Sequence, residues 1–232
     1  MRKEKFINGK IYHVLNRGAG QCNIFLDDED YLRFIHDLYE FNDEVPASNI
    51  YYRQTKSYDV GNRKVRPNRN RKCIVDILVF SLMNNHFHFL IRQKQDNGIQ
   101  IFMKKLGTGY ANYFNNKNKR VGVLFQGRFK AIPVQSDQHL LHLPYYIHLN
   151  SLDLYEPGWR KREIRNYKKV MEFLENYRWS SLPDYLGIKN FPSVINKNFL
   201  TELIGKPIEY KKSLISWLKD FNLDNIDDTI LE

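Results

Sequence analysis

The sequence contains few cysteines and no long apolar run. Only Cys22 and Cys73 occur among 232 residues, which excludes a disulfide framework and a four-thiolate metal cage, so both should be reduced and structural. No stretch approaches the roughly 20 apolar residues of a membrane span, and Met1 to Phe6 offers no apolar run for a secretory signal. A Gly-x-x-x-x-Gly-Lys-Ser/Thr phosphate loop is also absent. We therefore expect a cytoplasmic protein that makes no membrane contact.

Acidic residues are outnumbered by basic ones. The chain has 36 Lys and Arg against 26 Asp and Glu, a formal charge of +10, while 42% of its residues are hydrophobic and 14% aromatic. This composition supports a packed core and excludes wholesale disorder. The length suits one large domain, or one domain with an appendage. The positive charge favours a polyanionic partner such as nucleic acid, and the alternative is a basic soluble protein without that role.

The spacing of apolar residues predicts an alternation of strands and helices. Asn84 and Asn85 are typical of a turn between two paired antiparallel strands. Beyond residue 155 the pattern loosens into a basic, mostly helical tail. The predicted strands cover residues 11–17, 74–83, 86–92 and 123–134, and the predicted helices cover 27–39, 99–114 and, with Ser136 as its cap, 136–152.

Four consecutive acids, Asp27 to Asp30, begin the first predicted helix. A metal-dependent nuclease centre is one interpretation of such a cluster. Adjacent helical residues point in different directions and do not converge on one ion, whereas acids at a helix N-terminus cap it and interact favourably with its dipole. We therefore interpret the run as a capping segment.

Basic residues are concentrated between positions 53 and 72, where Asp59 is the only acid. This composition predicts a loop with strong positive potential. Tyr51, Tyr52 and Tyr58 could stack on unpaired bases there, and the alternative is an ordinary solvated loop. The basic residues are Arg53, Lys56, Arg63, Lys64, Arg66, Arg69, Arg71 and Lys72.

His86 and His88 are separated by one residue on a predicted strand. Both imidazoles therefore project from one face of the sheet, about 6 to 7 Å apart at the backbone, while Phe87 faces the other side. Such a pair can bind one metal ion, although two histidines on a strand are more often structural. Their place on a central apolar strand requires polar partners.

The third predicted helix offers Tyr146 and Asn150, which are four residues apart and share a face. A metal held by two histidines and a neutral oxygen retains open positions for a phosphate, which it can polarise. A tyrosine can then act as the nucleophile, with a nearby cation helping its phenol to ionise. The neighbouring Tyr145 lies about 100° away around the helix, so only one of the two phenols can face the histidines.

Several motifs occur together in a specific order between about residues 8 and 155. In that order they resemble the single-tyrosine HUH transposases, in particular the REP-associated tyrosine transposases and their insertion-sequence relatives. The sequence departs from the family pattern in two places. Ser151 occupies the position after Tyr146–Asn150 where a proline often stands, and the basic insertion at 53–72 is long. The motifs are Tyr12–Gly18 with Ile24-Phe25, His86–His88, Gly109–Asn115 followed by Leu124–Lys130, and Tyr146–Asn150.

The resemblance implies an α+β fold, a ferredoxin-like sandwich whose central antiparallel sheet carries both histidines. It implies cleavage of single-stranded DNA beside a hairpin, through a 5′-phosphotyrosine and a free 3′-hydroxyl. By position, Tyr146 matches the nucleophile, and His86, His88 and Asn150 match the ligands of a Mg²⁺ or Mn²⁺ ion. His148 points elsewhere on the helix, as a packing or DNA-contacting residue.

These considerations predict a catalytic domain over residues 1–155 and a basic helical extension over 156–232. The expected partner is single-stranded DNA that contains a hairpin, and the family includes both dimers that exchange the tyrosine helix and monomers. Two alternative functions are hairpin binding without turnover and metal-dependent phosphodiester hydrolysis by water. Besides the basic loop, the predicted DNA contacts are Arg17, Lys104, Lys105, Arg128 and Lys130.

Overall fold

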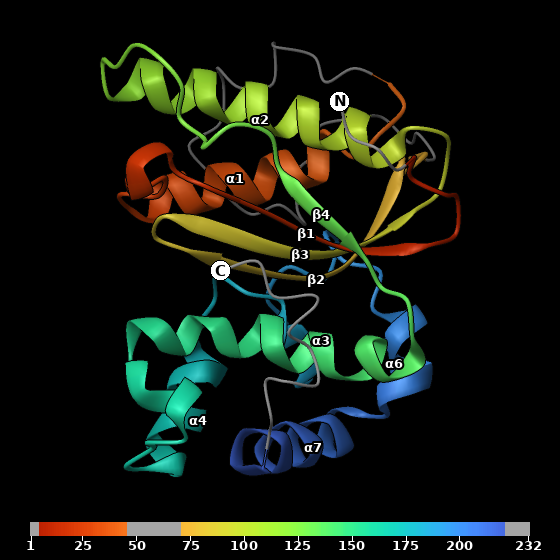
Figure 1. Cartoon of the computed structure of the whole chain (residues 1–232), viewed down its shortest axis with the longest axis vertical. Helices are drawn as coiled ribbons and strands as arrows, with labels where there is room; N and C mark the ends of the chain where they lie inside the picture. Colours follow the sequence, from red (N-terminus) through yellow and green to blue (C-terminus); the bar gives the residue numbers. More distant parts are fainter. Residues whose placement is uncertain (1–4, 46–70, 221–232) are drawn as a thin grey trace.

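A four-stranded antiparallel sheet separates two layers of helices (Figure 1). The computed structural model describes residues 5–45 and 71–220. Helices α1 and α2 cover one face, called here the first face, and α3 with the C-terminal helices covers the second. The strands are β1 (Ile11–Arg17), β2 (Val75–Met83), β3 (His86–Gln93) and β4 (Lys130–Pro133), and the first three helices are α1 (Asp28–Glu40), α2 (Gly98–Lys117) and α3 (Asp137–Leu149).

The strand order is β2-β3-β1-β4, and every neighbouring pair is antiparallel. Along the chain the elements run β1, α1, β2, β3, α2, β4. This is the ferredoxin-like topology, so the predicted fold class is confirmed. Strand β3 lies inside the sheet between β2 and β1, as its apolar sequence predicted.

The first face of the sheet packs aromatic side chains against α1 and α2. Phe87 and Phe89 of β3 are buried and contact Phe34 of α1, with ring centroids 5.2 and 6.2 Å from it. Tyr110 of α2 meets Phe34 edge to face at 4.8 Å. Because alternate residues of a strand point to opposite faces, the two phenylalanines leave His86 and His88 on the second face.

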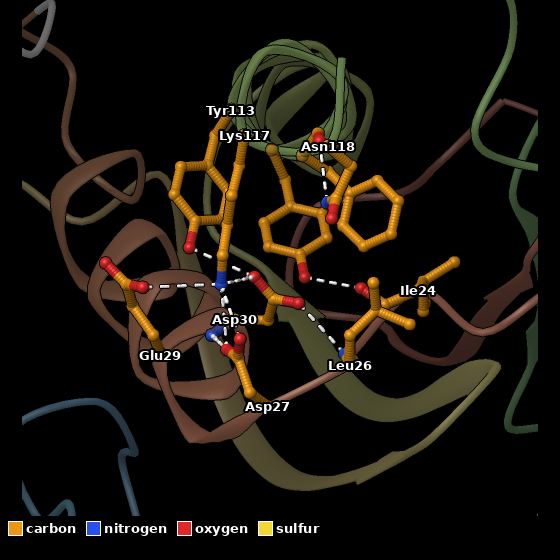
Figure 2. Close-up of polar contacts among 10 residues, drawn as sticks. Ile24, Leu26, Asp27, Glu29, Asp30, Tyr113, Lys117 and Asn118 are labelled. Atoms are coloured by element: carbon orange, nitrogen blue, oxygen red, sulfur yellow. Dashed lines mark hydrogen bonds and ion pairs between the residues drawn. The ribbon is translucent and has the colours of Figure 1, made fainter. Parts of the chain in front are cut away.

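The N-terminus of α1 is joined to the C-terminus of α2 by the cluster in Figure 2. Asp27 caps α1 by accepting from the backbone N–H of Asp30. Lys117 lies 2.8 Å from carboxylate oxygens of both aspartates and 3.3 Å from Glu29, and Tyr113 donates to Asp30. The capping interpretation of the acidic run is confirmed. Within residues 5–45 and 71–220, no group of three His, Cys, Asp or Glu side chains is arranged to hold a metal.

The chain beyond α3 packs onto the second face and along the outer edge of β2. Trp159, Leu174 and Tyr210 are buried in the same core as α3. Backbone hydrogen bonds join Leu82 to Trp179 and Phe80 to Ser181, both at 2.9 Å, and thereby cover the edge of β2. The elements here are the 3-10 turns η3 (Asn150–Leu154) and η4 (Pro157–Lys161) and the helices α4 (Tyr167–Asn176), α5 (Leu182–Tyr185), α6 (Asn198–Ile204) and α7 (Pro207–Asp220).

Two predicted element boundaries were wrong. The strand predicted over 123–134 contains only the four residues of β4, because Gly127 adopts a positive φ of 68° and the chain turns before Lys130. Helix α3 ends at Leu149 rather than near Leu152, since the backbone tightens into η3. In the described part of the chain, no helix combines the length and the apolar character needed to cross a membrane.

Candidate active site

The two histidines of β3 lie side by side on the second face of the sheet. Their ring centroids are 5.2 Å apart and their planes are nearly perpendicular. His88 is fully buried and lies opposite Leu15 of β1, whereas His86 is half-buried and lies opposite Arg17, where β3 begins. The pair therefore runs from the sheet interior towards its end.

Helix α3 places Tyr146 over these imidazoles. The Tyr146 ring is 6.1 Å from the His88 ring, centroid to centroid, and meets it edge-on at 89°. Tyr145 points to the other side of α3, where it stacks on Tyr210 at 5.1 Å. Of the two adjacent phenols, Tyr146 is thus the one that faces the histidines.

A third histidine, His13 of β1, belongs to the same cluster. Its Nε2 lies 2.9 Å from Nδ1 of His88, and its ring is 6.2 Å from that of Tyr146. The Nδ1 atom of His86 lies 2.6 Å from the side-chain oxygen of Asn85. Both histidines of β3 are therefore held at Nδ1 by a neighbour, as is usual for histidines that bind a metal through Nε2.

Asn150, one turn after Tyr146, is fixed at both ends of its amide. Its Nδ2 donates to the Tyr146 carbonyl at 2.9 Å, and its Oδ1 accepts from Arg160 Nη2 at 2.7 Å. The same guanidinium lies 3.4 Å from the Tyr146 hydroxyl and binds Asp153 at 2.8 Å. Arg160 of η4 thus connects the two residues of α3 and η3 that the sequence singled out.

The side chains gathered here include donors that a divalent ion can use. Two imidazoles with supported Nδ1 atoms fit such an ion through their Nε2 atoms, and an amide oxygen is a suitable third ligand. In this arrangement the oxygen of Asn150 accepts a hydrogen bond from a cationic group. An ion bound to this oxygen would lie next to the positive charge of Arg160, so movement of Arg160 would favour its binding.

The segment that contains these residues matches a known family. Residues 60–150 match the model of the family described as "Transposase IS200 like". This segment is therefore similar to the IS200-like transposases. The match includes His86, His88, Tyr146 and Asn150, and it confirms the resemblance inferred from the motifs.

Comparison with solved structures finds a REP-associated tyrosine transposase bound to a REP hairpin. The two chains are 9% identical, with a TM-score of 0.47, over 84% of this chain and 90% of the other. No match was found among curated proteins.

The centre of the candidate site is closed to solvent. Tyr146, His88 and Asn150 are each 0% exposed. His148 is also buried, with its ring nitrogens 2.7 Å from the Tyr210 hydroxyl and 2.8 Å from Ser181 Oγ, and burial lowers its pKa to about 3. His148 is therefore a neutral packing residue at ordinary pH.

Four of the predicted DNA contacts, Arg17, Lys104, Arg128 and Lys130, are exposed, and Arg17 also donates to the side chain of Gln126. Three others likewise contact the chain itself. Arg71 donates to the Tyr39 and Asn42 carbonyls, Lys105 donates to the Asp43 carbonyl at 2.7 Å, and Lys72 lies 3.8 Å from Glu44. The remaining residues, Arg53, Lys56, Arg63, Lys64, Arg66 and Arg69, lie outside the described residues.

Sequence reasoning missed the roles of His13 and Arg160. The alternation along β1 could place His13 on one face, but its contact with His88 depends on β1 lying beside β3. Arg160 lies in the predicted basic extension over 156–232. Its side chain turns towards α3, and no periodic pattern in the sequence predicts that contact.

Proposed function

We propose that this protein is a transposase that nicks and rejoins single-stranded DNA, with Tyr146 as nucleophile and a Mg²⁺ or Mn²⁺ ion held by His86 and His88 and completed by Asn150. The observation that carries the proposal is the position of the Tyr146 ring, 6.1 Å from His88 on the histidine face of the sheet. When bound, the ion supplies positive charge that polarises the scissile phosphate.

The reaction proposed is a transesterification. The Tyr146 oxygen attacks phosphorus as its proton leaves, and the bond from phosphorus to the 3′ oxygen breaks. The products are a 5′-phosphotyrosine and a 3′-hydroxyl, which takes up a proton. One ester replaces another, so rejoining by the reverse attack requires no nucleotide cofactor. The absence of a phosphate-loop motif from the sequence is consistent with this chemistry.

The neighbouring residues position the reacting groups. His13 and Asn85 orient the two imidazoles through their Nδ1 atoms. Arg160 holds the Tyr146 hydroxyl and the Asn150 amide in one arrangement. Because the phenol is fully covered and Arg160 contacts it, cleavage requires η4, which carries Arg160, to move away from Tyr146 and Asn150. That movement would release the Asn150 oxygen for the ion and the Arg160 cation for the phosphate.

The proposed partner is single-stranded DNA that contains a hairpin. The net charge of +10 and the exposed cations Arg17, Lys104, Arg128 and Lys130 support a polyanionic partner. Helix α3 lies over the histidines of its own chain. We therefore propose that one chain forms a complete site and that exchange of the tyrosine helix between two copies is not required.

Covalent trapping tests the proposal. The protein is incubated with a panel of DNA hairpins labelled at the 3′ end, since the downstream fragment would remain attached to the enzyme, and with Mn²⁺. We expect a labelled adduct from the wild type and from the matched variant Tyr145→Phe, and none from Tyr146→Phe. An adduct that persists in Tyr146→Phe would exclude this tyrosine as the nucleophile.

A second candidate function is hairpin binding without turnover. The complete burial of Tyr146 and the hydrogen bond from Arg160 to Asn150 favour it. DNA binding that is independent of metal, with no adduct from any hairpin, would support this function. Release of cleaved DNA without an adduct, unchanged in Tyr146→Phe, would instead indicate a phosphodiesterase that uses water.

A further inference from the structure

A pocket of about 350 Å³ lies on the first face of the sheet, opposite the histidines. It is bounded by α2, by the paired ends of β1 and β3, and by the segment that precedes β4. Asn16 and Phe87, which are register partners, form part of its wall. Phe125 and Phe129 contribute aromatic rings and Met103 an apolar side chain. The volume and the lining are typical of a small-ligand site.

Gly107 of α2 lines this pocket and has no side chain that would fill it. It lies inside a 20-residue helix, where glycine is less stable than alanine by about 1 kcal/mol. A Cβ atom at this position would meet no other atom within 4 Å, so no neighbouring element requires the glycine. By contrast, a Cβ at Gly109 would lie 2.5 Å from the Phe41 ring, which explains that residue by packing. The space beside Gly107 is therefore available to a ligand.

Positive charge and hydrogen-bonding groups surround the apolar wall. Lys104 and Arg128 line the pocket with exposed side chains, and neither forms an ion pair with another described residue. Asn16, Gln100 and Thr108 supply side-chain amide and hydroxyl groups. Aromatic faces with neighbouring cations are the usual combination for an unpaired base and its phosphates.

We infer that this pocket binds one unpaired nucleobase of the DNA substrate. The base would stack on the Phe125 or Phe129 ring, its edge would meet the polar groups of Asn16 and Gln100, and Lys104 and Arg128 would contact the flanking phosphates. The inference deepens the proposed function and rests on it for the identity of the nucleic acid.

The sheet register relates the pocket to the candidate active site. The pair Asn16–Phe87 lies between the pairs Arg17–His86 and Leu15–His88. Successive residues of a strand point to opposite faces, so the pocket lies directly behind the histidines. A strand of DNA that passes around this end of the sheet could therefore place a base in the pocket and a phosphodiester near His86.

The test fills the pocket without weakening the fold. Gly107→Leu places an aliphatic side chain in the space and favours the helix, so the melting temperature should not fall. Binding of fluorescent dT12, measured by anisotropy in EDTA so that no cleavage occurs, should weaken at least about fivefold, the loss of one stacked base. An abasic oligonucleotide of the same length should bind both proteins equally. The matched control Asn112→Leu, on an exposed position of α2, should bind dT12 like the wild type.

Two results would overturn the inference: unchanged dT12 binding by Gly107→Leu, or equal loss of binding to dT12 and to the abasic oligonucleotide. U12, measured in parallel, distinguishes the source of the base, because tighter binding of dT12 supports DNA and tighter binding of U12 would assign the pocket to RNA. These measurements do not involve Tyr146. Failure of covalent trapping would therefore not contradict the base-binding pocket, and unchanged dT12 binding by Gly107→Leu would not contradict the role proposed for Tyr146.

Discussion

The two faces of one sheet bury very different side chains. On the first face, β3 contributes Phe87 and Phe89 to an aromatic core beneath α1 and α2. On the second face, His86 and His88 of the same strand meet Tyr146, and a network of hydrogen bonds is enclosed by the apolar core around α3. A buried polar group destabilises the fold when its hydrogen-bond partner is removed, whereas an apolar group needs no specific partner. The comparison shows that the first face supports the fold and the second holds the groups suited to chemistry.

The largest effect expected from a network residue is that of Arg160→Met. Loss of the guanidinium leaves Asn150, Asp153 and the Tyr146 hydroxyl without this donor, so we expect adduct formation at saturating DNA to fall at least about tenfold, while DNA affinity changes little. Rates at saturating DNA and the dissociation constant are measured separately. Lys161→Met, the adjacent exposed position, is the control. A parallel loss of affinity would indicate that Arg160 binds DNA rather than positions Tyr146.

The first face should respond in stability rather than in activity. Lys117→Met removes the cation that joins α2 to the N-terminus of α1 and leaves the buried carboxylate of Asp30 uncompensated. We expect a loss of about 2 to 3 kcal/mol in the free energy of unfolding, measured by urea denaturation. Lys119→Met, at an exposed position nearby, should change it by less than about 0.5 kcal/mol. Equal stability of the two variants would show that the cluster in Figure 2 contributes little.

A smaller effect is expected at high pH from Tyr31 of α1. Burial raises its pKa to about 12, and its hydroxyl donates to Asn84 at 2.9 Å. In the unfolded chain the phenol has a pKa near 10 and loses its proton first, so its contribution to stability is complete below pH 10 and is lost as the pH rises towards 12. The slope of this contribution is at most about 1.4 kcal/mol per pH unit. Unfolding titrations of Tyr31→Phe should show a shallower alkaline decline than the wild type, and identical declines would contradict the assignment.

Much of the fold could be predicted because its elements have regular periods. Alternating and continuous apolar runs identified β1, β2 and β3, and helical stripes identified α1 and α2. The fourth strand was predicted too long because Val123 and Leu124 have strand-like side chains, whereas the positive φ of Gly127 decides where pairing begins. Local composition does not reveal which backbone conformation such a glycine adopts.

The candidate site was predictable only where one element supplied the whole signal. Residues on one strand or helix share a face at fixed spacing, so the pairs His86 with His88 and Tyr146 with Asn150 could be found from the sequence. The contact between His13 and His88 depends on the order of strands, and that of Arg160 depends on the path through η3 and η4. Such contacts arise from tertiary structure and leave no period in the sequence.

The covered edge of β2 restricts how two copies of this protein could associate. Backbone groups of Trp179 and Ser181 already occupy the hydrogen-bonding positions along its outer side. A continuous sheet shared by two molecules would therefore have to be built through β4, which offers only Lys130–Pro133. Any assembly of the described residues is thus expected to use helices or loops as its interface.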